Sequence, residues 1–206
     1  MKVSEILTYF IDTHFGSDQE SEITIRAMVT SFGERAFGFL LLVFALICII
    51  PIPVPGIHMF LSIPIFYLSV QQMTGRHVVW FPDKILDAKI PRHAFENISA
   101  RAIPWIIKIE AISKPRLEFL TQGFFFCFFG AVIFYITAFL AIPLPLTNLV
   151  PAIGIALMAL GLLNRDGLAL LIGAAIGITW SLLWYLAWYL GFLVLFTNLF
   201  PVLKGG

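Results

Sequence analysis

The chain has 206 residues, of which 60% are hydrophobic and only 12% are charged, and its mean hydropathy is +0.95. Soluble domains carry about 25% charged and about 45–50% apolar residues, so a soluble fold of this length has too little interior for so many apolar side chains. Thirteen Lys and Arg against twelve Asp and Glu give a net charge of +1, without the basic excess of a nucleic-acid-binding protein. The sequence therefore predicts an all-α, polytopic integral membrane protein.

Residues 1–35 are predicted to stay outside the hydrocarbon. Apolar residues recur at helical spacing over residues 3–11 and indicate a short amphipathic helix on a surface. Ser21 is a candidate N-cap for a second helix that ends near Gly33. We therefore interpret this part as a cytoplasmic amphipathic segment.

Residues 36–75 predict a first membrane hairpin. Two apolar segments, 36–50 and 57–73, flank the uncharged sequence Pro51-Ile52-Pro53-Val54-Pro55-Gly56. As helices they reach about 22 and about 26 Å at about 1.5 Å per residue, short of about 30 Å of hydrocarbon. These lengths fit a hairpin that turns within or near the bilayer. Backbone at that depth is tolerated where protein or a water-filled cavity surrounds it.

Residues 76–121 form a polar connection that holds eight of the thirteen Lys and Arg. After Pro104, apolar residues over 105–112 follow a helical period and predict a helix at the membrane interface.

Residues 122–167 repeat the hairpin pattern, with apolar segments 122–142 and 149–163 on either side of a second Pro-rich tip. Residues 168–206 begin with a full-length transmembrane candidate, 168–190, and continue into a shorter apolar segment.

The two hairpins match at a constant offset of 92 residues. The matched positions are Phe37 and Phe129, Gly38 and Gly130, Pro51 and Pro143, Pro53 and Pro145, Ile63 and Ile155, and Gly75 and Gly167. Because both PxP tips are followed at the same distance by a glycine beside a charged residue, we interpret the pattern as an internal duplication.

The basic residues orient the hairpins. Eleven of the thirteen Lys and Arg lie in residues 1–35 and 76–121, and neither PxP tip carries a charge. The positive-inside bias therefore predicts that the N-terminus, the long connection and the turn at 164–167 are cytoplasmic, with both hairpins in the same orientation.

Six stretches resemble the ExoD family of bacterial membrane proteins, which is named for exopolysaccharide synthesis. They are GERAFG (33–38), PIPVPG (51–56), QQMTGR (71–76), WFPDKI (80–85), IEAISKPRLEFLTQG (109–123) and IPLPLTNLVPAIGIALMALGLLNRDGLALLIG (142–173). The family usually has small residues where this chain has Pro55-Gly56-Ile57-His58. The resemblance implies a protein of the bacterial inner membrane with a part in making or exporting surface polysaccharide, and it implies no particular molecular activity.

Charged residues flank the predicted cytoplasmic ends of both hairpins. They are Glu34, Arg35, Arg76, Arg116, Arg165 and Asp166. One interpretation is topological, with positive-inside residues, helix caps and local ion pairs. The other is a shallow site for an anionic lipid headgroup or phosphate, because a guanidinium matches phosphate oxygens in pairs.

The hairpin tips are a second candidate site. Proline has no N–H and leaves backbone carbonyls without their usual partner, so a tip can bind a small cation or polar substrate or be a plain tight turn. The candidate residues are Pro51, Pro53, Pro55, His58, Pro143, Pro145, Asn148 and Pro151. For His58 the alternatives are a hydrogen bond to a freed carbonyl and a proton relay.

Two features of the last apolar segment concern packing. Gly173 and Gly177 form a small-residue face that serves either packing within the chain or a homodimer. Trp180, Trp184 and Trp188 line one face, as an interface anchor or a sugar-stacking platform.

The sequence contains no nucleophile, phosphate-binding or dinucleotide motif, and its four histidines lack metal-ligand spacing, so we expect no cofactor and no metal, and a non-catalytic role is favoured. A small transporter or lipid-carrier-handling protein is the first functional hypothesis, with membrane lipids as partners. A non-catalytic partner or scaffold of polysaccharide synthesis or export proteins is the second. A membrane-embedded transferase is the third.

Overall fold

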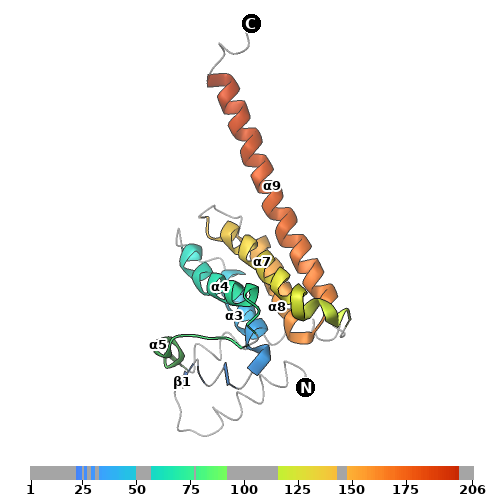
Figure 1. Ribbon diagram of the computed structural model, residues 1–206. Coiled ribbons are helices and arrows are strands. Elements are labelled where there is room, and N and C mark those ends of the chain that lie inside the picture. The colour runs from blue at the N-terminus through green and yellow to red at the C-terminus, as the bar shows by residue number, and fades with distance from the viewer. Residues whose placement is uncertain are drawn as a thin grey trace.

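The computed structural model describes residues 22–24, 26, 29–30, 33–49, 57–76, 78–91, 116–142 and 148–199. This part of the chain is mainly helical, as predicted, with five long helices, whose arrangement can be followed in Figure 1. They are α3 (Ala36–Ile49), α4 (Ile57–Met73), α7 (Gly123–Leu140), α8 (Leu149–Asn164) and α9 (Gly167–Leu199). The predicted helices at 3–11 and 105–112 and the prolines of both PxP tips lie outside the described residues.

Helices α3, α4, α7 and α8 pack as a bundle in which α3 lies along α8 and α4 lies along α7. Glycine permits the close approach of α3 to α8 and of α7 to α4. A Cβ at Gly38 would lie 2.9 Å from the Ala159 carbonyl oxygen, and one at Gly130 would lie 2.8 Å from the Met73 backbone nitrogen. The interior is apolar, and its fully buried side chains include Phe37, Leu41, Ile65, Ile133, Ile136 and Ile155. In a bilayer such side chains stabilise the bundle through close van der Waals packing, because lipid tails are as apolar as the helix surfaces they cover.

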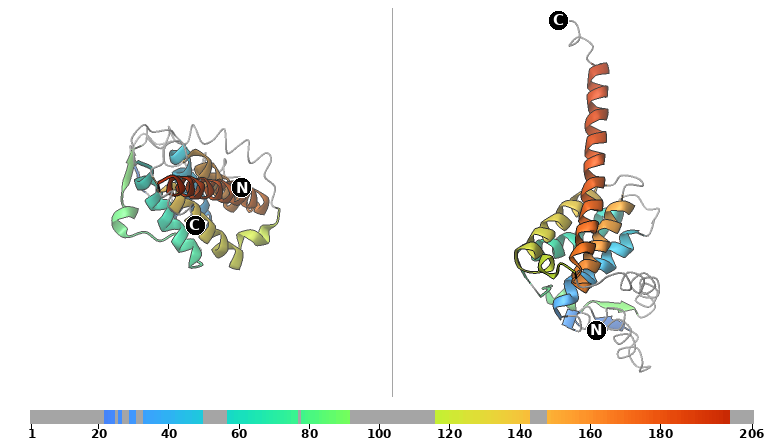
Figure 2. Two further views of the ribbon diagram at one scale, coloured as in Figure 1. Left: turned by 90° about the horizontal axis from the view of Figure 1, so that it is seen from above. Right: turned by 90° about the vertical axis from the view of Figure 1, so that its right-hand side faces the viewer.

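Helix α9 has 33 residues, which is about 50 Å at about 1.5 Å per residue. Its first half packs on α8, where Gly173 and Gly177 face Gly154. The helix continues through Gly191, so the short segment predicted after residue 190 joins it as far as Leu199. Its second half projects beyond the bundle (Figures 1 and 2) and exposes large side chains, including Leu186, Trp188, Tyr189 and Phe192.

Two helices in the described part of the chain are long and apolar enough to cross a membrane. They are α7 and the first 26 residues of α9, Gly167–Phe192, whereas α3 and α8 are shorter apolar helices. Together with the composition, this agrees with the prediction of a membrane protein.

The predicted helix starting at Ser21 is wrong over Glu22–Thr24, which form strand β1. Strand β1 pairs antiparallel with β2 (Lys89–Pro91), with Ile23 opposite Ile90. A strand needs a partner to satisfy its backbone, and here the partner is distant in sequence. A local capping signal could not predict this pairing.

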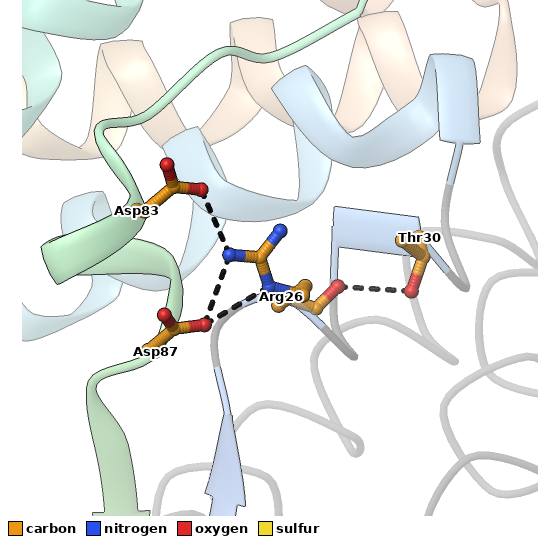
Figure 3. A network of polar contacts seen from close by, with 4 residues as sticks. All are labelled: Arg26, Thr30, Asp83 and Asp87. Atoms are coloured by element: carbon orange, nitrogen blue, oxygen red, sulfur yellow. Dashed lines mark hydrogen bonds and ion pairs between the residues drawn. The ribbon is translucent and has the colours of Figure 1, made fainter.

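A clasp of charged side chains lies beside the strand pair (Figure 3). Arg26 Nε donates to Asp87 Oδ1 at 3.0 Å, and Arg26 Nη2 donates to Asp83 Oδ1 at 2.9 Å, from the short helix α5 (Asp83–Leu86). Both hydrogen bonds raise the pKa of the Arg26 guanidinium, and the bond to Asp87 has the larger effect. The clasp joins the N-terminal segment to the connection that follows α4.

Candidate functional site

The candidate site lies at one end of the bundle, which we call the basal end. Helices α3, α7 and α9 begin there and α4 and α8 end there, since Gly38 adjoins Leu163 and Gly130 adjoins Met73. The 3-10 helices η1 (Gly33–Arg35) and η2 (Glu118–Thr121) lie at the starts of α3 and α7. The basal end therefore carries the predicted arginines Arg35, Arg76, Arg116 and Arg165.

Arg165 lies at the corner between α8 and α9, and the backbone of Arg116 reaches the same corner. Arg165 adopts a left-handed conformation that ends α8, and its Nη1 donates to Glu118 Oε1 at 2.7 Å. Both side chains are about half exposed, at 49% and 46%. The Gly167 N–H donates to the Arg116 carbonyl at 2.7 Å. A Cβ at Gly167 would lie 2.5 Å from the Leu117 carbonyl oxygen, so glycine is required for this contact.

Arg76 follows the end of α4 and is exposed. Its guanidinium carbon lies 5.9 Å from the centre of the Trp80 ring, within cation–π range. The buried Gln71 holds the Trp80 backbone through two hydrogen bonds: Gln71 Nε2 donates to the Trp80 carbonyl at 2.9 Å, and the Trp80 N–H donates to Gln71 Oε1 at 2.8 Å. The chain thus presents an arginine and an indole together at the surface.

Asp166 caps α9. The residue is 5% exposed, and its Oδ1 accepts from the backbone N–H groups of Leu168 at 3.0 Å and Ala169 at 3.3 Å. A carboxylate in this position satisfies free N–H groups and interacts favourably with the helix dipole. Asp166 therefore acts as a helix cap. The carboxylate that pairs with Arg165 belongs to Glu118.

The basal end also exposes apolar side chains. We call them the basal collar, which consists of Met73, Val78, Trp80, Leu117, Phe119, Phe124, Phe125 and Phe128. Phe125 lies edge-on to both Phe119 and Phe124, with ring centres 5.6 and 6.0 Å apart. Trp, Phe and Leu side chains beside basic residues are typical of segments that lie in the membrane–water interface.

The described tip residues lie at the opposite end of the bundle, where α3 ends and α4 and α8 begin. His58 Nε2 lies 3.3 Å from the Cys48 carbonyl oxygen, as in the hydrogen-bonded alternative. Asn148 and Pro151 are buried at the start of α8. Among the described residues no group of three or more His, Cys, Asp or Glu is placed to hold a metal ion.

On α9, Trp188 is exposed, while Trp180 and Trp184 are partly covered. Gly173 and Gly177 are both buried against other helices of the chain. This small-residue face therefore serves packing within the chain, the first of its two predicted roles.

Glu118, Gln71 and Trp80 were not predicted as partners of the arginines. Glu118 and Arg165 are 47 residues apart, and no sequence spacing links them. The sequence offers one signal for Gln71, which is the Gln71-Gln72 pair at the end of an apolar segment. A polar side chain buried at such a place needs a hydrogen-bond partner.

The comparisons with known proteins agree with this chain's motifs. The family described as "Exopolysaccharide synthesis, ExoD" matches residues 4–186. The chain is 31% identical to Protein ExoD of Rhizobium meliloti over 170 residues, which cover 81% of this chain and 69% of that protein. It is 29% identical to an uncharacterized protein of Synechocystis sp. over 162 residues, which cover 76% of this chain and 74% of that protein. No solved structure matches. The chain belongs to the ExoD family, whose name links it to exopolysaccharide synthesis.

Proposed function

We propose that this protein is a multi-pass protein of the bacterial inner membrane that handles an anionic lipid or lipid-linked carrier during exopolysaccharide synthesis or export. The basal end faces the cytoplasm and binds the phosphate of that lipid. The observation that carries the proposal is the exposure of Arg76, Arg116 and Arg165 beside the basal collar.

The geometry supports binding of a molecule that is charged at one end and apolar at the other. The collar contacts acyl chains, while guanidinium groups donate paired hydrogen bonds to phosphate oxygens. Each basic residue near an anionic surface contributes about 1 kcal/mol of attraction. Glu118 reduces the local positive charge by one, and Arg76 and Arg116 keep the described corner basic.

The duplication belongs to the same proposal. The first helix of each hairpin packs on the second helix of the other, and these contacts are made at matched glycines, Gly38 and Gly130. This arrangement supports two hairpins of one origin related by an approximate two-fold axis, with both PxP tips away from the cytoplasm. Two hairpins that face each other in this way can rock against each other, as transporter repeats do.

The decisive experiment measures binding of the purified full chain to vesicles of zwitterionic lipid with and without anionic lipid. Replacing Arg76 and Arg165 together with Gln should weaken binding to anionic vesicles about tenfold or more, from about 1 kcal/mol for each residue. Replacing both with Lys should restore only part of the loss, because Lys lacks the planar fork.

Lys84→Gln is the matched control, since it also removes an exposed positive charge, on α5, and leaves Arg76 and Arg165 in place. It should change binding less than either arginine replacement. Equal binding by the wild-type chain and the Arg76→Gln, Arg165→Gln variant would leave these arginines as determinants of topology, and would favour a scaffold that docks synthesis or export proteins.

A further inference from the structure

Arg165, one of the arginines proposed to bind the lipid phosphate, already holds a carboxylate. Its Nη1 donates to Oε1 of Glu118 at 2.7 Å, and the two side chains are 49% and 46% exposed. An ion pair at this exposure is reached by water and salt, and it contributes little to the stability of the fold. The same exposure lets a molecule at the surface reach the Arg165 guanidinium.

The backbone on both sides of this ion pair has an unusual conformation. Among the described residues, the non-glycine residues with positive φ are Leu117 and Arg165, both at φ 54°. Leu117 directly precedes Glu118 at the start of η2, and Arg165 ends α8. A left-handed conformation costs free energy in a residue with a Cβ, and such residues cluster at ligand sites and switch regions. Two of them at one corner favour a functional pair over a chance meeting of surface side chains.

The Glu118 carboxylate is a weaker partner for Arg165 than a phosphate is. Oε1 of Glu118 also accepts from Gln122 Nε2, at 3.3 Å, so two donors share one oxygen. The structure shows one hydrogen bond from Arg165 to Glu118, whereas a guanidinium can donate two parallel hydrogen bonds to a phosphate. A phosphate can therefore replace Glu118 on Arg165, and the displaced carboxylate keeps Gln122 as a donor.

This exchange needs no change in the fold. Leu120 and Thr121, later in η2, are buried, and the Gly167 N–H donates to the Arg116 carbonyl at 2.7 Å. These contacts keep η2 on the turn before α9 while the exposed Glu118 side chain rotates away.

We propose that Glu118 is an internal competitor for the lipid phosphate, which occupies Arg165 in the absence of lipid and is displaced when an anionic lipid binds. This inference rests on the proposed function and names how that site is regulated. Return of the carboxylate to Arg165 favours release of the phosphate, so the lipid binds reversibly. A protein that handles a lipid has to release it as well as bind it.

Binding of the purified full chain to vesicles of equal parts phosphatidylcholine and phosphatidylglycerol tests this in a cycle of variants. Glu118→Gln should bind about fivefold more tightly than the wild-type chain, which is about what one freed positive charge contributes near an anionic surface. With Arg165→Gln already present, the same change should tighten binding by less than about twofold, because no guanidinium is left to free. Asp83→Asn is the control, since it also removes an exposed negative charge and leaves the Arg165–Glu118 pair in place. It should change binding less than Glu118→Gln does.

An equal gain from Glu118→Gln with and without Arg165 would overturn the inference, and so would a gain no larger than that of Asp83→Asn. The proposed function fails separately, if loss of Arg76 and Arg165 leaves binding to these vesicles unchanged. Weaker binding without the arginines, together with no gain from Glu118→Gln, would refute the competitor and leave the proposed function standing. Vesicles of phosphatidylcholine alone measure general adsorption and should bind all variants equally.

Discussion

At the scale of single residues, glycine sets the distance between helices in this bundle. At Gly38 a methyl group would lie 2.8 Å from Leu163 Cγ and 2.9 Å from the Ala159 carbonyl oxygen. Backbone atoms cannot move aside as the end of a flexible side chain can. The close contact between α3 and α8 therefore depends on the absence of a side chain.

We expect Gly38→Ala and Gly130→Ala each to destabilise the chain by about 1–3 kcal/mol, the usual cost of overpacking. Gly191→Ala is the matched control, because a Cβ there meets nothing within 4 Å and alanine favours a helix by about 0.5–1 kcal/mol over glycine. Thermal unfolding of the purified proteins in detergent measures the differences. Equal unfolding midpoints for Gly38→Ala and Gly191→Ala would contradict the close-packing argument.

Asp166 acts on a single helix end. We expect Asp166→Ala to destabilise the protein by about 0.5–2 kcal/mol, because two N–H groups of α9 lose their acceptor. Asp166→Asn keeps a capping oxygen and should lose much less. The same thermal unfolding assay separates the two, and similar losses for both would assign the effect to charge instead of capping.

At the scale of elements, a few side chains hold the connection after α4 against the bundle. Gln71 makes two hydrogen bonds to the backbone of Trp80, and Tyr67 stacks on Phe81 with ring centres 5.3 Å apart. The clasp of Arg26 with Asp83 and Asp87 and the pairing of β1 with β2 hold the next residues. The basal end is thus built from segments distant in sequence.

Replacing Gln71 with Met should free this connection while keeping the side-chain volume. Each hydrogen bond contributes about 0.5–1.5 kcal/mol, so the Trp80 amide should exchange with deuterium about tenfold faster. Hydrogen exchange of the peptide containing Val79–Phe81 measures this. Gln122→Met, which removes one exposed bond of 3.3 Å to Glu118, should leave that exchange unchanged, and an equal effect of both variants would argue against a specific role for Gln71.

At the scale of the whole molecule, the two ends of the bundle differ in chemistry. The basal end carries the described arginines that follow α4 and precede α9, and the far end begins α4 and α8 with apolar and neutral residues. By the positive-inside bias, the basal end is expected in the cytoplasm. Helix α9 extends past the far end of the bundle (Figure 2) with an apolar surface, which suits contact with lipid.

Topology is tested by cysteine labelling in intact cells, in a background without native thiols. A membrane-impermeant reagent added from the periplasm should leave Lys89→Cys, in β2, unlabelled until the membrane is permeabilised. Leu149→Cys, an exposed position at the far end of α8, serves as the opposite control. Efficient labelling of Lys89→Cys in intact cells would reverse the proposed orientation.

The sequence by itself determined the helices and the family. Long apolar runs predict α3, α4, α7, α8 and the start of α9, and the prolines between them predict the breaks, because helix formation and interruption depend on neighbouring residues. The motifs of the ExoD family are equally local, being runs of consecutive residues. The same logic placed Arg76 and Arg165 at helix ends, where the structure has them.

Only the tertiary structure decided which residues meet. Glu22–Thr24 form a strand because Lys89–Pro91 lie beside them, and Arg165 pairs with Glu118 because η2 packs on the turn before α9. Gln72 reads as an ordinary polar residue at a helix end until packing buries it against α7, where its Nε2 donates to the Phe126 carbonyl. These contacts join positions tens of residues apart. Their net free energy is what burial contributes less the entropy lost in closing the chain between them, and no local pattern encodes either.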